Sequence, residues 1–435
     1  MRKFIQTIQN IWKIEDLRSR LLTTILFVLI YRFGSFIVLP GINPDALSAL
    51  QAQTEGGLMA LLDMFSGGAF SNASIFALGI MPYISASIVI QLLTIAVPYF
   101  QKMQKEGESG RQKMNQITRY LTVAILLFQG PSYLVNLSVQ MAQAGQAISV
   151  GFNWFTISST ILLCAGSMFV MWLGERITDR GIGNGISFII LIGIIARFPA
   201  AIIQEFSSRL NEGGGLMVFI LEIILLLFVF AFAILLVQGT RRIPVQYAKR
   251  MVGNKQYGGV RQYIPLKVNA ANVMPIIFAQ AIMFIPIALA GFSTSESASA
   301  FTRAFMDNDG FWYNAVFALL IIVFTYFYTA IIINPVQMAE NLKLNNGFIP
   351  GVKPGKKTAE YIDTIMTRLT LPGSVLLAII AILPAFARLF GVSMGFAQFF
   401  GGTSLLIMVG VILDTLQQIE SKLLERHYDG FYESG

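Results

Sequence analysis

Apolar runs of about 20 residues recur along the whole chain, and a helix of that length and composition can cross the hydrocarbon core of a bilayer. Hydrophobic residues make up 55% of the 435 residues, whereas charged residues make up only 12% and cluster in the gaps between the runs. The sequence therefore predicts an all-α polytopic membrane protein and excludes a soluble enzyme.

Ten of the runs are long enough to span a membrane. An odd number of spans in each half gives the two halves opposite orientations, so ten spans permit two inverted, pseudo-symmetric halves of five helices with a site between them. We expect these halves at 21–203 and 216–416, joined by an external hinge loop at 204–215. The predicted spans are Leu21–Leu39, Ile75–Val97, Tyr120–Gln140, Trp154–Leu173, Ile186–Ile203, Leu216–Val237, Val273–Phe292, Phe311–Ile333, Leu369–Phe390 and Gln398–Leu416.

The basic residues predict the orientation of the chain. With ten spans, both termini and the two long charged loops, 238–271 and 334–368, lie on one face, and 26 of the 31 Lys and Arg residues belong to it. The segments 41–74 and 141–153 contain none. Basic loops remain on the cytoplasmic side. We therefore expect the amphipathic N-terminus (1–20), both long loops and the tail (417–435) to be cytoplasmic, which also explains the net charge of +8 without nucleic acid.

One apolar segment, Leu58–Phe65, is too short to cross a membrane. Glycine pairs bound it, and it leads into the span Ile75–Val97, which carries Pro82. Irregular backbone at membrane depth persists only where protein or a water-filled cavity solvates it. The arrangement predicts that the protein encloses a cavity, and that function lies there.

No pattern of catalytic or metal-binding residues accompanies this cavity. The one histidine, His427, lies in the tail, and the one cysteine, Cys164, lies in an apolar run and forms no disulfide within the chain. We therefore predict no catalytic residue, no metal and no cofactor. Charges inside the spans are few: Arg32 lies late in its span, where its side chain can snorkel to the interface, and Glu222 lies near the external end of its span, where it can reach water.

Two pairs of isoleucines stand out in the middle of the spans. Ile80 and Ile84 lie one helical turn apart beside Pro82, and Ile186 and Ile190 repeat this spacing. Apolar residues four apart are ordinary helix-packing residues, and composition alone favours that interpretation. The alternative is a hydrophobic constriction, because rings of apolar side chains close pores by dewetting.

Six motifs resemble the signatures of the bacterial SecY family, whose members form the central subunit of the Sec protein-conducting channel. The resemblance covers all ten predicted spans, and the motifs occur in the order of the family. They are GIMPYISASIVIQLL (79–93), KEGESGR (105–111), RGIGNGISFII (180–190), RRIPVQYAKR (241–250), GFIPGVKPG (347–355) and FGGTSLLI (400–407).

The resemblance implies three structural sites. A plug at 57–71 closes the external side, a ring of six isoleucines constricts the pore, and a lateral gate between the second and seventh spans, backed by the third and eighth, opens toward lipid. The implied plug residues include Gly57, Leu61, Leu62, Met64, Phe65, Gly67 and Gly68; the ring comprises Ile80, Ile84, Ile186, Ile190, Ile277 and Ile407; Gln91, Gln129 and Gln280 are candidates for gate hydrogen bonds.

The resemblance also implies that the long cytoplasmic loops dock the ribosome or the motor ATPase SecA. The docking candidates are Arg241, Arg242, Lys249, Arg250, Lys353, Lys356 and Lys357. Lys353 stands where the family usually has Arg, so the positive charge is kept but the planar guanidinium fork is lost.

The function expected from these observations is a channel, not an enzyme. It would move unfolded polypeptide across the bacterial inner membrane and release hydrophobic segments into the lipid, with SecE, SecG, SecA, the ribosome and signal sequences as partners. A secondary transporter of small solutes is the alternative, and it requires a polar or charged site at the midplane. An intramembrane enzyme requires paired Asp, Ser and His, or metal ligands within the spans.

Overall fold

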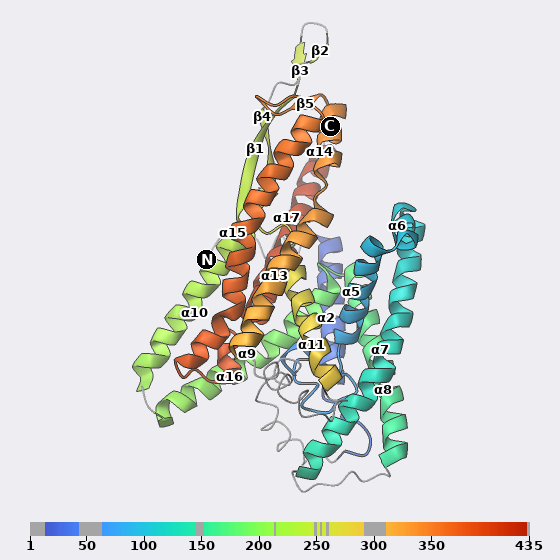
Figure 1. Ribbon diagram of the computed structural model, residues 1–435, viewed down its shortest axis with the longest axis vertical. Helices are drawn as coiled ribbons and strands as arrows, with labels where there is room; N and C mark the ends of the chain where they lie inside the picture. The colour runs from blue at the N-terminus through green and yellow to red at the C-terminus, as the bar shows by residue number, and fades with distance from the viewer. Residues whose placement is uncertain are drawn as a thin grey trace.

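The computed structural model describes residues 14–42, 63–143, 152–212, 215–247, 250–252, 255–257, 261–290 and 310–432. Ten long helices in this part of the chain occupy the positions of the ten predicted spans (Figure 1). They are α2 (Glu15–Gly34), α5 (Met81–Ala96), α7 (Glu108–Gln143), α8 (Phe152–Arg180), α9 (Gly185–Glu212), α10 (Gly215–Gln238), α11 (Met274–Ala290), α13 (Phe311–Ile332), α15 (Lys356–Leu389) and α17 (Gly402–Tyr432). The predicted all-α polytopic fold is confirmed.

Seven of the described helices are long and apolar enough by themselves to cross a membrane. Helix α5 meets the same criteria only when it is counted together with α6 (Pro98–Lys105), which is bent from it by 100°. Helix α11 is a shorter apolar helix. Helix α2 carries charges at both ends, Arg18 and Arg20 at one and Arg32 at the other, which leave a short apolar stretch between them.

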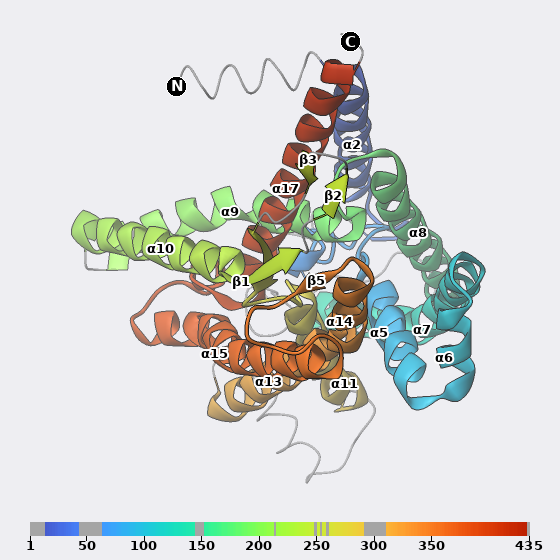
Figure 2. The ribbon, with the colours of Figure 1, turned by 90° about the horizontal axis from the view of Figure 1, so that it is seen from above.

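The helices of the two sequence halves meet along the centre of the molecule, and α9 of the first half runs beside α10 of the second (Figure 2). Helices α5, α7 and α8 lie on one side, and α11, α13 and α15 lie on another. The halves meet where α5 packs against α11 and where α9 packs against α10, α17 and the short helix α16 (Met394–Ala397). One large apolar cluster runs through this meeting region and contains residues of both halves.

The structure corrects the predicted start of the second span. Helix α5 begins at Met81 rather than at Ile75, because Gly79, which lies between them, has a φ angle of 54°, which a right-handed helix excludes. Pro82 consequently lies in the first turn of the helix, where its missing N–H removes no helical hydrogen bond.

The predicted hinge loop at 204–215 is wrong. Helix α9 continues to Glu212 and α10 begins at Gly215, so most of that segment is helical. Glu205 and Arg209 lie four residues apart and form an ion pair, which supports the extra helical turns. The polar composition of this stretch suggested a loop, whereas Glu205 and Arg209 are paired inside the bundle.

The first long charged loop contains strands that the sequence analysis did not predict. Strand β1 (Thr240–Tyr247) pairs antiparallel with β4 (Arg261–Lys267) and with β5 (Gly347–Phe348) of the second long loop, and β2 (Arg250–Val252) pairs with β3 (Lys255–Tyr257) beyond them. In β1, Ile243 and Val245 point inward between exposed residues, as the two-residue period of a strand requires.

These strands share a separate apolar core with the helices below them. Ile243 and Val245 pack with Leu342 of α14 (Pro335–Leu344) and with Ile362 of α15. Strands β1, β4 and β5, helix α14 and the start of α15 thus form one small unit, here named the loop unit, at the end of the molecule near the C-terminus (Figure 1).

Candidate plug, pore and lateral gate

The described part of the candidate plug segment, called the plug below, is a chain of tight turns buried in the N-terminal half. It starts with one helical turn at 63–65 and continues through turns to Ile80. The plug candidates Met64, Phe65, Gly67 and Gly68 are all buried. The further plug candidates Gly57, Leu61 and Leu62 lie outside the described residues.

Two glycines allow the plug backbone to lie directly against α9. A Cβ atom on Gly67 would lie 2.8 Å from the Cα of Gly193, and a Cβ on Gly193 would lie 2.8 Å from the carbonyl oxygen of Phe65. Gly67 also has a φ of 65°, which side chains disfavour. Any larger residue at either position would push the plug away from the helix.

Polar side chains from three helices hold this buried backbone. The Tyr31 hydroxyl of α2 donates to the carbonyl oxygen of Ser66 at 3.0 Å, and the Tyr133 hydroxyl of α7 donates to that of Phe70 at 2.9 Å. Arg197 of α9 forms an ion pair with Asp63. These bonds satisfy groups that would otherwise be costly to bury.

Arg32 does not follow the snorkelling expectation. Its Nη1 atom donates to the carbonyl oxygen of Gly67 at 2.7 Å, so the guanidinium points to the plug, while its Cζ atom lies 5.3 Å from the centroid of the Phe36 ring. The carbonyl acceptor lies 35 residues away in sequence, so local reasoning could not identify it.

The six candidate ring isoleucines come from both halves; four of them belong to one apolar cluster, and Ile186 and Ile277 pack against it. The cluster also contains Met64 and Phe65 of the plug. Four members are nearly fully buried and two are half-buried. The six residues are Ile80 and Ile84 at the start of α5, Ile186 and Ile190 of α9, Ile277 of α11 and Ile407 of α17.

The three glutamines assigned to the gate lie in different settings. Gln91 of α5 accepts a hydrogen bond from the hydroxyl of Tyr328 of α13, and this bond joins the two halves. Gln280 of α11 donates to the Tyr313 hydroxyl at 3.4 Å within the C-terminal half, whereas Gln129 lies half-buried in α7.

Tyr328 is a candidate gate residue that the sequence analysis missed, since a tyrosine in a run of aromatic residues gives no signal of its own. Its ring lies edge-on to Phe278 of α11, with the centroids 4.7 Å apart. Tyr328 therefore contacts both α5 and α11, the two helices that would border the candidate gate.

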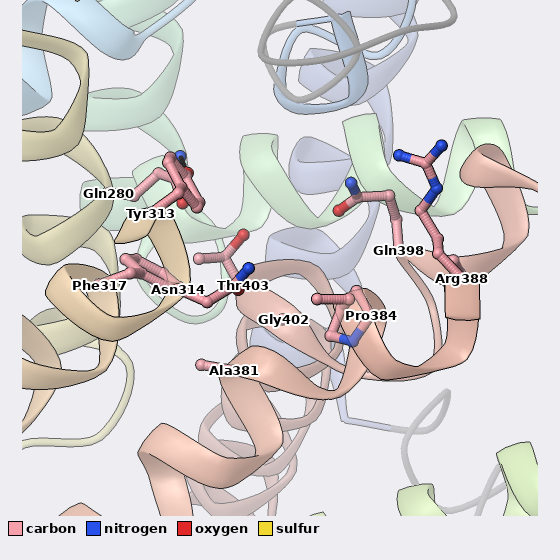
Figure 3. Close-up of a pocket in the computed structure, with 12 residues that line it drawn as sticks. Gln280, Tyr313, Asn314, Phe317, Ala381, Pro384, Arg388, Gln398, Gly402 and Thr403 are labelled. Carbon is pink, nitrogen blue, oxygen red and sulfur yellow. Dashed lines mark hydrogen bonds between the residues drawn. The ribbon is translucent and has the colours of Figure 1, made fainter. Parts of the chain in front are cut away.

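A pocket lies in the C-terminal half beside α11 (Figure 3). Gln280 and Tyr313 border one side of it, and Arg388 and Gln398 border the opposite side. Gly402 and Pro384 lie between these two sides. The pocket adjoins the gate helix but lacks a paired acid and base.

Glu222 does not reach water as expected. It is buried and accepts a hydrogen bond from Arg209 Nη2 at 2.5 Å. Arg209 Nε also donates to Glu205 at 2.9 Å, and the backbone N–H of Ser393 donates to the same carboxylate at 2.8 Å. This Arg209 cluster connects α9, α10 and the turn before α16. Within the described residues, no group of three or more His, Cys, Asp or Glu side chains could hold a metal ion.

The described basic docking candidates lie on the loop unit or on the hairpin β2–β3 next to it. Arg241 and Arg242 are exposed on β1, and Lys353 is exposed at the tip of the second loop. Lys356 and Lys357 open α15, where Lys357 pairs with Glu360 at 3.3 Å. Arg250 begins β2, and Lys249 lies outside the described residues.

Comparisons with known proteins agree with this architecture. The SecY family model matches residues 74–416. A protein translocase subunit SecY of Streptomyces scabiei is 43% identical over 97% of this chain and 98% of its own length, and one of Aquifex aeolicus is 42% identical over 98% of both.

Among solved structures, a SecY channel described for its plug domain covers 93% of this chain and 92% of its own, with a TM-score of 0.62 and 18% identity. Sec61 from the canine ribosome–channel complex covers the same shares, with a TM-score of 0.57 and 16% identity. These two likenesses concern the fold, and the identity to the curated relatives extends over nearly the whole sequence. The chain belongs to the SecY family.

Proposed function

We propose that this chain forms the protein-conducting channel of a bacterial inner membrane, through which unfolded polypeptides cross and hydrophobic segments leave sideways into the lipid. The observation that carries the proposal is the apolar cluster that unites six isoleucines of both halves with the plug. A path between the halves would be narrowest at these side chains and filled by the plug when no chain is present.

An apolar constriction suits a substrate of any sequence. Aliphatic side chains offer no hydrogen bonds, so a passing chain is not held, and a narrow apolar ring excludes water and ions when it is empty. The buried turns of the plug add a second barrier on one side of the ring. No covalent chemistry is required, and the energy comes from a partner.

The packing of α5 against α11 supports an exit toward lipid. These helices belong to different halves and border the central cluster. A hydrophobic segment that enters the pore would be more stable in lipid than in water, and it can leave where these helices separate. The hydrogen bond between Gln91 and Tyr328 is a polar contact across this exit.

We infer the partners from the exposed basic surface of the loop unit. The long loops of this unit share one apolar core, so Arg241, Arg242 and Lys353 project from a rigid base. Such a surface suits docking of the motor ATPase SecA or of ribosomal RNA. SecE and SecG are the proposed membrane partners, with both termini of this chain in the cytoplasm.

The transporter alternative is not supported. The described central cluster is apolar, and the buried charges lie in the Arg209 cluster and at the plug, where they are paired. The curated relatives named above are protein translocase subunits.

The test is transport by purified components. The full chain, co-expressed with its SecE and SecG counterparts, is placed in vesicles and supplied with SecA, ATP and a preprotein with a signal sequence. We expect a protease-protected preprotein that requires this chain and ATP. Vesicles that take up small solutes but protect no preprotein would contradict the proposal.

A further inference from the structure

Two charged side chains tie the plug to one helix of the N-terminal half. We infer that the ion pair between Asp63 and Arg197, here named the plug latch, holds the plug closed independently of the lateral gate. The inference rests on the proposed channel function and extends it to the step that releases the plug.

Asp63 connects both ends of the described plug. Its Oδ1 atom accepts the backbone N–H of Ser71 at 2.7 Å, and its other carboxylate oxygen pairs with Arg197. Arg197 Nη2 also donates to the Ser71 hydroxyl at 2.8 Å. A Cβ atom on Gly68 would lie 3.3 Å from the same nitrogen, so the guanidinium lies against the turn of the plug.

Because Asp63 is nearly buried, its ion pair with Arg197 contributes to the stability of the closed state. The Asp63 side chain is 9% exposed, whereas that of Arg197 is 35% exposed. A nearly buried carboxylate loses most of its hydration and depends on its partners for stabilisation. If Arg197 is removed, the carboxylate is stabilised by moving into water, which requires the plug to leave its site.

All the polar contacts described for the plug come from the N-terminal half. Arg32 and Tyr31 belong to α2, Tyr133 to α7 and Arg197 to α9. Separation of α5 from α11 breaks none of these bonds. The plug latch and the lateral gate are therefore separable, and the plug stays with the N-terminal half until the latch breaks.

The experiment measures ion conductance in planar bilayers without a substrate, using the full complex. Asp63→Asn and Arg197→Gln should each raise the leak at least about fivefold, because each removes an interaction made only in the closed state. Arg197→Lys keeps the charge and should leak less than Arg197→Gln. The matched control is Arg119→Gln, which breaks an ion pair with Glu175 at 2.7 Å in the same half, away from the plug, and should not change the leak.

A second measurement separates release of the plug from general damage to the fold. Met64 is 5% exposed, and replacing Cys164 leaves the chain without cysteines. In a Cys164→Ser background, Met64→Cys should react with a membrane-impermeant thiol reagent severalfold faster when Arg197→Gln is added. The unfolding temperature of the Arg197→Gln protein should match that of the Arg119→Gln control.

If Asp63→Asn and Arg197→Gln leak no more than the parent, and Arg197→Gln does not speed the labelling of Met64→Cys, the plug latch would be overturned, even if transport proceeds normally. If the parent protein itself transports no preprotein, the proposed function would be contradicted instead. An increased leak in Arg119→Gln as well would show a general structural effect and would also overturn the plug latch.

Discussion

Lys353 provides the residue-scale test of the docking surface. It is exposed between Gly351 and Gly355, which have positive φ angles, and its carbonyl oxygen accepts a hydrogen bond from the Thr358 hydroxyl at 3.0 Å. The loop tip is therefore held in place. We expect Lys353→Glu to lower SecA-driven preprotein uptake by about tenfold or more, since a repulsive charge replaces an attractive one in the interface.

Lys353→Arg should preserve or improve uptake, because Arg keeps the positive charge and adds a planar guanidinium fork. The measurements are uptake into vesicles and stimulation of SecA ATPase activity. Lys343→Glu is the matched control, because Lys343 is an exposed basic residue of the same long loop outside the docking set. Unchanged uptake by the Lys353→Glu vesicles would make Lys353 an ordinary solvated charge.

Arg209 provides a second residue-scale test, which concerns the stability of the fold. Its side chain is 14% exposed and pairs with two carboxylates that are almost completely buried. Arg209→Leu should lower the free energy of unfolding by about 3–5 kcal/mol, since two acidic groups remain in a dry site without their partner. Arg119→Leu, which breaks a more exposed pair, should cost no more than about 1 kcal/mol.

Denaturant titration of both variants in detergent measures the difference. Equal stability of the Arg209→Leu and Arg119→Leu proteins would contradict the structural importance of the Arg209 cluster. The sequence could not predict this cluster, because Glu205 and Glu222 lie on separate helices and the Ser393 N–H comes from a turn 188 residues after Glu205.

The plug gives the first test at the scale of an element. Its backbone lies among helices that are complete without it, so deletion of residues 61–71 should leave a folded complex with a raised ion leak. The comparison is the conductance of intact and deleted channels in planar bilayers. A deleted channel that conducts no more ions than the intact one would contradict the assignment of the plug.

The hydrogen bond between Gln91 and Tyr328 gives the second test at the scale of an element. Tyr328→Phe removes only the hydroxyl, and one hydrogen bond contributes about 0.5–1.5 kcal/mol. The variant should favour the open gate by a factor of about 2–10 and accept signal sequences of lower hydrophobicity. Its ion leak should change less than that of Arg197→Gln.

Tyr313→Phe is the matched control for this prediction. The Tyr313 hydroxyl pairs with Gln280 inside the C-terminal half, so separation of the halves leaves that bond intact. Transport of preproteins with graded signal sequences measures the effect. Identical thresholds for Tyr328→Phe and the parent would exclude this bond as part of the gate.

At the scale of helices and strands, the sequence predicted which helices exist better than where they end. Runs such as Leu216–Val237 and Phe311–Ile333 match α10 and α13 almost residue for residue, because uninterrupted apolar composition determines both. The β-strands were missed, since Arg241, Arg242 and Pro244 suggested a solvated loop while only Ile243 and Val245 follow the strand period.

For the whole molecule, the sequence predicted a central path between two halves but not the contacts that close it. Spacing identified Ile80 with Ile84 and Ile186 with Ile190 as pairs, and the resemblance to the SecY family added Ile277 and Ile407. The pairing of Asp63 with Arg197 depends on how α9 lies beside the plug. Many helix arrangements satisfy the same pattern of apolar runs, so such long-range contacts required the structure.

The central claim is that polypeptide passes between the halves through the apolar cluster. In a Cys164→Ser background, Ile84→Cys and Ile277→Cys place a thiol on each half. Leu127→Cys places a thiol on the outside of α7, where the Leu127 side chain is 56% exposed. A translocating chain arrested across vesicles should crosslink to the first two positions and not to the third. Crosslinks of Ile84→Cys and Ile277→Cys to lipid probes alone, or equal crosslinking of the chain to Leu127→Cys, would contradict the account.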